Sequence, residues 1–180
     1  GINWNLQNIG LTSWLTGIRF ADTSLGWAVG ERGLILRTTD GGIAWSQMKN
    51  GFNSNLSSIS FPSFNYGWSV GDEGNIGVIR NTTNRGASWE VQFTGYRVRY
   101  NAISFIDSLK GWVCGSYGSI LKTANGGQNW HFQTTGIISA LQSIVFLDSL
   151  TGFACGKNGR ILRTTNGGQS WLIRSLGSGL

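Results

Sequence analysis

An eight-residue pattern that recurs along the whole chain limits the folds open to it more than any other feature. It reads Thr-Thr-Asp-Gly-Gly-Ile-Ala-Trp at residues 38–45, and further copies occupy residues 82–89, 123–130 and 164–171. The tryptophans that close the copies follow one another at steps of 44, 41 and 41 residues. A period in this range is typical of folds in which each repeat is one supersecondary unit. We call this pattern the octet.

Each octet has the composition of a tight turn between two strands. A Thr hydroxyl and an Asp or Asn side chain can hydrogen-bond to nearby backbone groups, and Gly adopts a positive φ without strain. The Trp begins the next strand and can cover the turn with a large apolar ring. We assign to this structural turn motif Asp40, Gly42, Trp45, Asn84, Gly86, Trp89, Asn125, Gly127, Trp130, Asn166, Gly168 and Trp171.

Three further strand patterns fill the interval between octets. The first places an Ile and a Phe two residues apart on one face, as in Ile18 and Phe20. The second is Gly-Trp-Ala-Val-Gly at residues 26–30, with its aromatic and its Val on one side. The third has consecutive apolar residues before a cation, as at residues 35–37, which indicates a strand covered on both faces. The second repeat inserts three residues across positions 75–81, and this predicts a bulge or a longer hairpin.

Four short strands in each repeat, with no helix between them, predict an all-β fold of β-propeller blades, each with four antiparallel strands. The 28 Gly, the single Pro and an apolar content of 40% fit many short strands around a substantial core. No run of 18 apolar residues occurs, so we expect no transmembrane segment. We predict a single domain over residues 1–180, with four complete repeats at 4–44, 45–88, 89–129 and 130–170 and a final strand at 171–180.

The chain starts within a further copy of the pattern, because Gly1-Ile2-Asn3-Trp4 matches residues 42–45 at a distance of 41 residues. We therefore expect the natural N-terminus to lie upstream, so that a signal segment would not be visible. The incomplete repeats at both ends favour a segment of a larger propeller. The alternative is an unusually small propeller of four blades.

Cys114 and Cys155 occupy equivalent positions in successive repeats, where the earlier repeats have Val29 and Val70. This equivalence favours two small buried apolar side chains over a disulfide or a metal pair.

The units resemble the bacterial neuraminidase (Asp-box) repeat, most closely the variety found in photosystem II stability/assembly factor-like proteins. The shared residues are Phe, Asp, Gly-Trp-Ala-Val-Gly, Ile-Leu-(Arg/Lys)-Thr, Asn/Asp-Gly-Gly and Trp, and they recur over essentially the whole chain. The box has Asp only at Asp40 and Asn at the other three positions, and an Asn keeps the acceptor oxygen. The resemblance implies a propeller of six to eight blades that acts outside the cytoplasm, in the periplasm, a lumen or at the cell surface.

A sialidase-like enzyme needs a carboxylate pair or a Tyr–Glu pair beside a cluster of arginines. The glutamates are Glu31, Glu73 and Glu90, and two of them lie in connections that vary between repeats. Asp22, Asp107 and Asp148 recur with the repeat, which indicates turn acceptors, whereas a catalytic residue is expected once. The single His131 has no neighbouring ligand pattern. We therefore predict no catalytic residue, no cofactor and no metal.

The remaining functional signal is a net charge of +6, part of which is periodic. Arg37, Lys122 and Arg163 share one strand position in three repeats, and Arg80 lies close to it in the second. Equivalent positions in a propeller lie at equivalent radii, so we expect an arc of cations that binds an acidic protein partner. The alternative is that each long side chain covers the apolar edge of the neighbouring blade. Nucleic-acid binding is not favoured, because the charge is not clustered on one recognition element.

These observations favour a non-enzymatic binding or assembly scaffold, with a protein partner in or beside a membrane complex as the resemblance implies. Two alternatives remain open. One is a carbohydrate-active enzyme whose catalytic residues lie in blades outside this sequence, for which carbohydrate would be the ligand. The other is a structural surface or filament protein in which the repeats are rigid spacers.

Overall fold

The computed structural model describes residues 6–7, 9–48 and 50–175. The expected partial repeat at Trp4 and the last five residues of the expected final strand, 176–180, lie outside the described residues.

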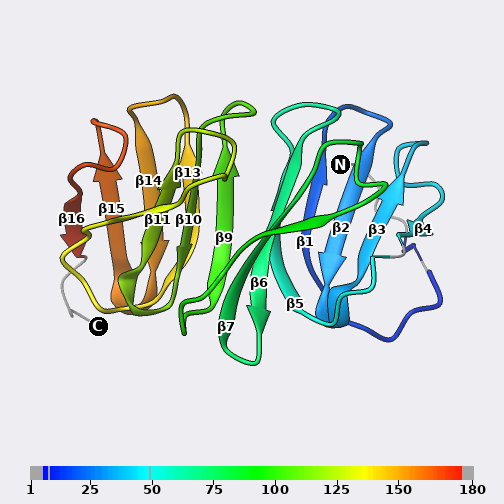
Figure 1. Ribbon diagram of the computed structural model, residues 1–180, viewed down its shortest axis with the longest axis horizontal. Helices are drawn as coiled ribbons and strands as arrows, with labels where there is room; N and C mark the ends of the chain where they lie inside the picture. Colours follow the sequence, from blue (N-terminus) through cyan, green and yellow to red (C-terminus); the bar gives the residue numbers. More distant parts are fainter. Residues whose placement is uncertain (1–5, 8, 49, 176–180) are drawn as a thin grey trace.

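Four four-stranded antiparallel sheets form the molecule, and they follow one another along its longest axis (Figure 1). In every sheet the strands are hydrogen-bonded in the order in which they occur in the chain. Sheet 1 contains β1 (Leu15–Phe20), β2 (Gly26–Gly30), β3 (Ile35–Thr38) and β4 (Ser46–Gln47). Sheet 2 contains β5 (Asn55–Ser60), β6 (Gly67–Glu73), β7 (Ile76–Thr82) and β8 (Glu90–Thr94). Sheet 3 contains β9 (Tyr100–Phe105), β10 (Gly111–Gly115), β11 (Ile120–Thr123) and β12 (His131–Gln133). Sheet 4 contains β13 (Leu141–Phe146), β14 (Gly152–Gly156), β15 (Arg160–Thr164) and β16 (Leu172–Ser175).

The described residues contain no α-helix, only three short 3₁₀ turns between the second and third strands of sheets 1, 3 and 4. These turns are η1 (Glu31–Gly33), η2 (Ser116–Gly118) and η3 (Lys157–Gly159). Accordingly, no helix in this part of the chain is long and apolar enough to cross a membrane. The all-β class and the four-stranded antiparallel blades expected from the repeats are confirmed.

Each octet is the turn between the third and fourth strands of a sheet, and its hydrogen bonds are local. In sheet 3, the Thr123 hydroxyl donates to Asn125 Oδ1 at 3.0 Å and accepts the backbone N–H of Gly127 at 2.9 Å. Asn125 Oδ1 also accepts the backbone N–H of Asn129 at 3.0 Å. The other three octets repeat these bonds within 0.3 Å, whether the acceptor is the carboxylate of Asp40 or the amide of Asn84 or Asn166. The turn therefore needs the acceptor oxygen and not the charge.

The sheets pack face to face through a joint that recurs three times. In the joint between sheets 3 and 4, the Trp112 ring stacks on Phe146 at 3.6 Å between centroids and an interplanar angle of 7°. Trp112 Nε1 donates to the backbone oxygen of Gly167, in the octet of the next sheet, at 3.1 Å. The equivalent stacked pairs are Trp27 with Phe61 and Trp68 with Phe105. We call the face that carries the Trp the front face and the face that receives it the back face.

The octet tryptophans complete each joint from the side. Trp171 meets the edge of Phe146 at 5.9 Å between centroids and an angle of 87°. Trp45, Trp89 and Trp130 make the same edge contact with the Phe of their own sheet. In each of the three joints, the recurring Phe therefore lies between two tryptophans, one from its own sheet and one from the preceding sheet.

Each of the two end sheets has one face that no other described sheet covers, although Ile9 packs against Ala28 and Leu36 on the back face of sheet 1. On the back face of sheet 1, the side chain of Ile18 is 64% exposed, and on the front face of sheet 4, Ile161 and Leu172 are 44% and 53% exposed. The alternative of a closed four-bladed ring is wrong, since closure would bury both faces. The expected propeller segment is confirmed.

The two cysteines differ because of this arrangement. Cys114 lies in the joint between sheets 3 and 4 and is fully buried. Cys155 has the same position on the front face of sheet 4 and is exposed, because none of the four described sheets covers that face. The prediction of two buried cysteines is correct for Cys114 and wrong for Cys155.

The longer hairpin expected in the second repeat is present. Strands β6 and β7 stay paired out to Glu73 opposite Ile76, and Gly74 and Asn75 form a two-residue turn with φ values of 59° and 71°. Positive φ at both central residues is the geometry of the most common hairpin turn. The hairpin replaces the 3₁₀ turn that the other three sheets have at this place.

Candidate partner-binding surface

The carboxylates and the histidine that could carry chemistry do not converge. Glu31 is in η1, Glu73 ends β6 and Glu90 begins β8, at the opposite end of sheet 2 from Glu73. No group of three His, Cys, Asp or Glu side chains suitable for a metal occurs among the described residues. His131 is exposed at the start of β12.

The recurring aspartates act as turn acceptors between the first and second strands. Asp148 Oδ1 accepts the backbone N–H groups of Leu150 and Thr151, both at 2.7 Å. Asp22 and Asp107 make the same pair of bonds. These backbone N–H groups hold the pKa of Asp148 and of Asp22 below the ordinary value of 3.8. The three aspartates are therefore committed to their turns.

Three of the four cations expected to form an arc share a register position. Arg37, Lys122 and Arg163 lie opposite Trp27, Trp112 and Phe153 on the front faces of their sheets. The Lys122 ammonium lies 5.5 Å from the centroid of the Trp112 ring, and burial, with a smaller contribution from Lys110, lowers its pKa. Arg37 is half-buried, whereas Arg163 is exposed. The Lys122 side chain thus lies over a blade joint, as the alternative interpretation of the arc expects.

Arg80 does not belong to this set. It pairs with Ser69, while Asn81 pairs with Trp68, so Arg80 lies one position out of register and points to the back face. The same position in the other three sheets holds Leu36, Leu121 and Leu162. The assignment of Arg80 to the arc is corrected, because one step along a strand reverses the face on which a side chain lies.

The surroundings of Arg80 are those of a core side chain. Arg80 is 3% exposed, its guanidinium lies 3.7 Å from the centroid of the Phe52 ring, and NH2 donates to Ser54 Oγ at 2.5 Å. Glu73 Oε2 lies 3.6 Å from NH2. Burial lowers the pKa of Arg80, and the Glu73 carboxylate opposes this shift.

Two other arginines form a surface hollow that the repeat pattern did not reveal. The Arg97–Arg99 hollow has a volume of about 370 Å³ and is lined by Asn75, Arg97, Arg99, Ser116 and Tyr117. Arg99 donates from Nε and NH2 to Asn75 Oδ1 at 2.9 and 2.7 Å, and its Nε lies 3.8 Å from the carboxylate of Asp72. Within the described ranges, the Arg97 side chain forms no hydrogen bond and no ion pair.

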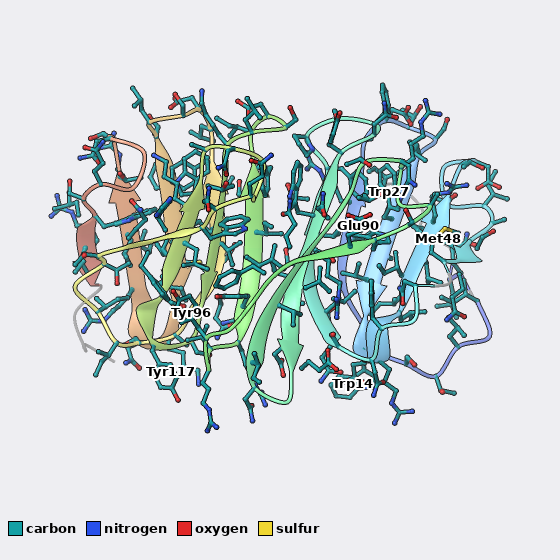
Figure 2. The ribbon with its side chains drawn as sticks, in the orientation of Figure 1. Trp14, Trp27, Met48, Glu90, Tyr96 and Tyr117 are labelled. Atoms are coloured by element: carbon teal, nitrogen blue, oxygen red, sulfur yellow. The ribbon has the colours of Figure 1, made fainter. Side chains whose placement is uncertain are left out.

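Backbone contacts set the shape of this hollow, and equivalent contacts occur at the same place in the other sheets. Ser116 N–H donates to the backbone oxygen of Arg99 at 2.9 Å, and a Cβ on Gly115 would lie 2.1 Å from that oxygen. Gly115 therefore permits the close approach that places Arg99 beside η2. Tyr117 is the central residue of η2 with φ of 57°, and its side chain is 71% exposed (Figure 2).

The residues that line the hollow occupy positions that vary between repeats. The position of Arg99 is taken by Trp14, Asn55 and Ala140 in the other sheets, and that of Tyr117 by Arg32 and Asn158. The fold therefore does not require an arginine or a tyrosine there. The signal that could have revealed the hollow is the Arg-Val-Arg alternation at residues 97–99, which has no counterpart in the other repeats.

This arrangement suits a ligand with carboxylates. A guanidinium presents a planar set of donors that matches a carboxylate, and an exposed tyrosine adds an apolar ring with a hydroxyl. Two arginines and a tyrosine around one hollow can therefore hold an acidic or C-terminal segment of a polypeptide.

The chain matches one family model, photosynthesis system II assembly factor YCF48, over residues 1–95 and again over residues 92–178. No curated protein matches the chain.

Solved structures share the fold. A structure described as YCF48 bound to D1 peptide is 22% identical, with a TM-score of 0.77, over 93% of this chain and 56% of the other. YCF48 from Cyanidioschyzon merolae is 24% identical, with a TM-score of 0.73, over 96% of this chain and 59% of the other. An ancestral GH74 enzyme is 18% identical, with a TM-score of 0.72, over 93% of this chain and 25% of the other. The chain therefore spans less than two thirds of the length of the YCF48 structures that it resembles.

Proposed function

Because the chain belongs to the photosynthesis system II assembly factor YCF48 family, we propose that it is a non-enzymatic assembly module that binds a polypeptide of a membrane complex. The similar structure of YCF48 with a D1 peptide supports a peptide of photosystem II as the ligand. The family also supports a site of action outside the cytoplasm, on the lumenal or periplasmic side of a membrane.

The observation that carries the proposal is the Arg97–Arg99 hollow. It combines two arginines and an exposed tyrosine at positions that the fold leaves free to vary. Exposed aromatic and arginine side chains are the residues that most often dominate the binding energy of protein interfaces. Arg97 has no acidic partner within the described part of the chain, so its charge is available to a ligand.

No specific contact in the structure favours a carbohydrate-active enzyme. The likeness to a GH74 enzyme is at 18% identity and shows the fold alone. Glu73 and Glu90 lie at opposite ends of one sheet, so they do not form the carboxylate pair that glycoside hydrolysis requires.

Binding can be tested with overlapping synthetic peptides of the D1 protein, labelled with a fluorophore and followed by anisotropy. We expect one acidic or C-terminal peptide to bind the wild-type chain. The double reversal Arg97→Glu with Arg99→Glu should weaken this binding at least tenfold, since it replaces two attractive contacts by repulsion. The effect should be largest at low ionic strength, where surface charges are least screened.

The matched control is the double reversal Arg37→Glu with Arg163→Glu, which changes the net charge by the same amount on the expected arc. If the hollow is the site, this control should slow association slightly and leave the dissociation rate unchanged. A larger loss in the control than in the hollow variant would transfer the site to the arc of Arg37, Lys122 and Arg163. Failure of every D1 peptide to bind the wild-type chain would refute the proposed function.

A further inference from the structure

A second hollow, of about 470 Å³, lies where the first strands of sheets 1, 2 and 3 end. Among the described residues that line it, Arg19 is the only one with a charged side chain, and Phe61, Pro62 and Phe64 belong to its apolar wall. We call it the Arg19 hollow. Its volume is within the usual range of roughly 300 to 1,000 Å³ for pockets that bind small ligands.

The Arg19 hollow and the Arg97–Arg99 hollow lie at opposite ends of the first strands. Phe105, the last residue of β9, lines the Arg19 hollow, whereas Arg99 immediately precedes the first residue of β9. A strand of six residues spans roughly 20 Å, so the two hollows are separate sites. Arg19 itself is on the front face of sheet 1, which packs against sheet 2.

Arg19 replaces a serine that has a structural role in the next two sheets. It has the strand position of Ser60 and Ser104, since all three lie opposite the tryptophan of the second strand. Ser60 Oγ accepts the backbone N–H of Phe105, and Ser104 Oγ accepts that of Phe146, both at 3.1 Å. A guanidinium has no acceptor atom, so Arg19 cannot take over this role.

Two donors in the lining of the hollow consequently lack an acceptor. Phe61 is the equivalent of Phe105 in sheet 2 and is 2% exposed, and its N–H has no hydrogen-bond acceptor among the described residues. A buried backbone N–H is rarely left unpaired. The Arg19 side chain forms no hydrogen bond and no ion pair within the same part of the chain. Asp22, the nearest carboxylate in sequence, accepts backbone N–H groups of its own turn.

The apolar wall combines a fixed ring with an accessible one. The Phe61 ring is stacked on Trp27 at 3.5 Å between centroids, so it is held in place. Phe64 is 50% exposed. The other repeats have Thr23, Ser108 and Ser149 at its position. The fold therefore requires neither Phe64 nor Arg19, and both depart from the repeat at the same hollow.

We propose that the Arg19 hollow binds a carboxylate that is attached to an apolar group. One carboxylate oxygen takes the place of the serine Oγ and accepts the N–H of Phe61, while Arg19 supplies the opposite charge. The apolar group packs against Phe64 and Pro62. A small organic acid and the C-terminal residue of a polypeptide share this chemistry. This inference is independent of the proposed function, because it concerns a different hollow.

The test is a titration of the whole chain with 3-phenylpropanoate, followed by two-dimensional ¹H–¹⁵N NMR. We expect the amide resonance of Phe61 to shift on binding, because its N–H gains a charged acceptor. The neutral amide 3-phenylpropanamide keeps the ring and loses the charge, so it should bind at least tenfold more weakly, as expected for a charge-assisted pair.

A second ligand distinguishes the two sources of the carboxylate. N-acetyl-phenylalanine imitates the C-terminal residue of a polypeptide. Tighter binding of N-acetyl-phenylalanine than of 3-phenylpropanoate would assign the hollow to a polypeptide C-terminus, and the reverse order would assign it to a small organic acid. Both results require the same shift of the Phe61 amide.

The variant Arg19→Ser gives sheet 1 the residue that sheets 2 and 3 have at this position. Its hydroxyl can accept the N–H of Phe61 and its charge is zero, so we expect the fold to be retained, as measured by circular dichroism, and the probe to bind at least tenfold more weakly. Arg37→Ser is the matched control, because it removes one charge from the same face of sheet 1 outside the lining. It should bind the probe as wild type does.

Three results would overturn the proposal. The first is equal affinity of wild type and Arg19→Ser for 3-phenylpropanoate, and the second is equal affinity of wild type for the acid and its amide. The third is a wild-type spectrum in which no probe shifts the Phe61 amide.

Discussion

At the scale of a residue, the environment of Arg80 shows that one position along a strand decides on which face of the sheet a side chain lies. Its position holds a core Leu in the other three sheets, and its Nε and NH1 are buried without a hydrogen-bond partner in the described structure. Replacing a buried charge by a well-packed apolar side chain is often neutral or stabilising.

We therefore expect Arg80→Leu to leave the urea midpoint of unfolding unchanged or to raise it. Arg80→Ala is the matched control, and it should destabilise the protein by about 2 kcal/mol, because it leaves a cavity against Phe52. Ser54 Oγ keeps a partner in both variants, since it donates to Glu73 Oε2 at 2.9 Å. A loss in Arg80→Leu as large as in Arg80→Ala would show that the guanidinium itself is required.

The contribution of Asp40 to stability can be tested by changing the pH, because the other three octets have an Asn at its position. The N–H of Ala44 and then the Thr38 hydroxyl donate to its carboxylate and hold its pKa below the ordinary value of 3.8. A carboxyl whose pKa is lower in the folded state adds stability above its unfolded pKa and loses it as the pH falls through the folded pKa. The contribution of Asp40 is thus present at neutral pH and lost below about pH 3.8.

We expect Asp40→Asn to have a smaller fall in thermal midpoint than wild type when the pH is lowered through this range. The amide keeps the acceptor oxygen, as in Asn84, so the two proteins should have similar midpoints near neutral pH. Asp22 and Asp148 leave some pH dependence in the variant, because their pKa values are also lowered. Identical pH profiles would show that the octet carboxylate is not linked to folding.

At the scale of the element, each second strand begins with a glycine that makes room for the aromatic pair of the joint. A Cβ on Gly111 would lie 2.4 Å from the Phe105 ring, which is stacked on Trp68 of the preceding sheet. The ring cannot withdraw without losing that stack. A small change in β10 therefore affects the packing of the joint between sheets 2 and 3.

We expect Gly111→Ala to destabilise the protein by about 1 to 3 kcal/mol, the usual range for overpacking a core. Gly17→Ala is the control within a strand, since its nearest contact would be Val29 Cγ2 at 3.2 Å, a distance that small shifts can relieve. Guanidinium unfolding followed by tryptophan fluorescence measures both. Equal midpoints for the two variants would mean that the Phe105 ring has room to move.

At the scale of the whole molecule, stability should decrease from the middle of the row of sheets to its ends. Among the described residues, sheets 2 and 3 have a neighbouring sheet on both faces, whereas sheets 1 and 4 have one on a single face. In repeat architectures each unit is stabilised chiefly by its immediate neighbours. Strand β10 and strand β14 have equivalent sequences, but β10 is buried throughout and β14 only in part.

We expect the amides of β14 to exchange with solvent faster than those of β10. Hydrogen exchange followed by mass spectrometry resolves the two strands, and slower exchange reports the greater cost of local opening. Equal protection of β10 and β14 would show that the sheets unfold as a single unit.

The sequence by itself determined the repeat, the strands and the turns. The octet hydrogen bonds join residues at most four positions apart, so Thr123, Asn125 and Gly127 specify their turn without help from the rest of the chain. The aromatic and apolar positions alternate with period two, which predicts both covered faces of each strand. The position of the fourth strand after each octet Trp follows from the same local pattern.

Only the tertiary structure decided whether the side chains that depart from the repeat pattern are buried, and where a ligand can bind. Arg80 is buried because it takes the back-face position that Leu36 has in sheet 1, one step from the position of Arg37. Cys155 is exposed because none of the four described sheets covers its face. The hollow around Arg97 and Tyr117 brings together residues from two sheets. These outcomes depend on register and on the packing of sheets distant in sequence, and the physical reason is that a strand pattern specifies two faces but not what covers each of them.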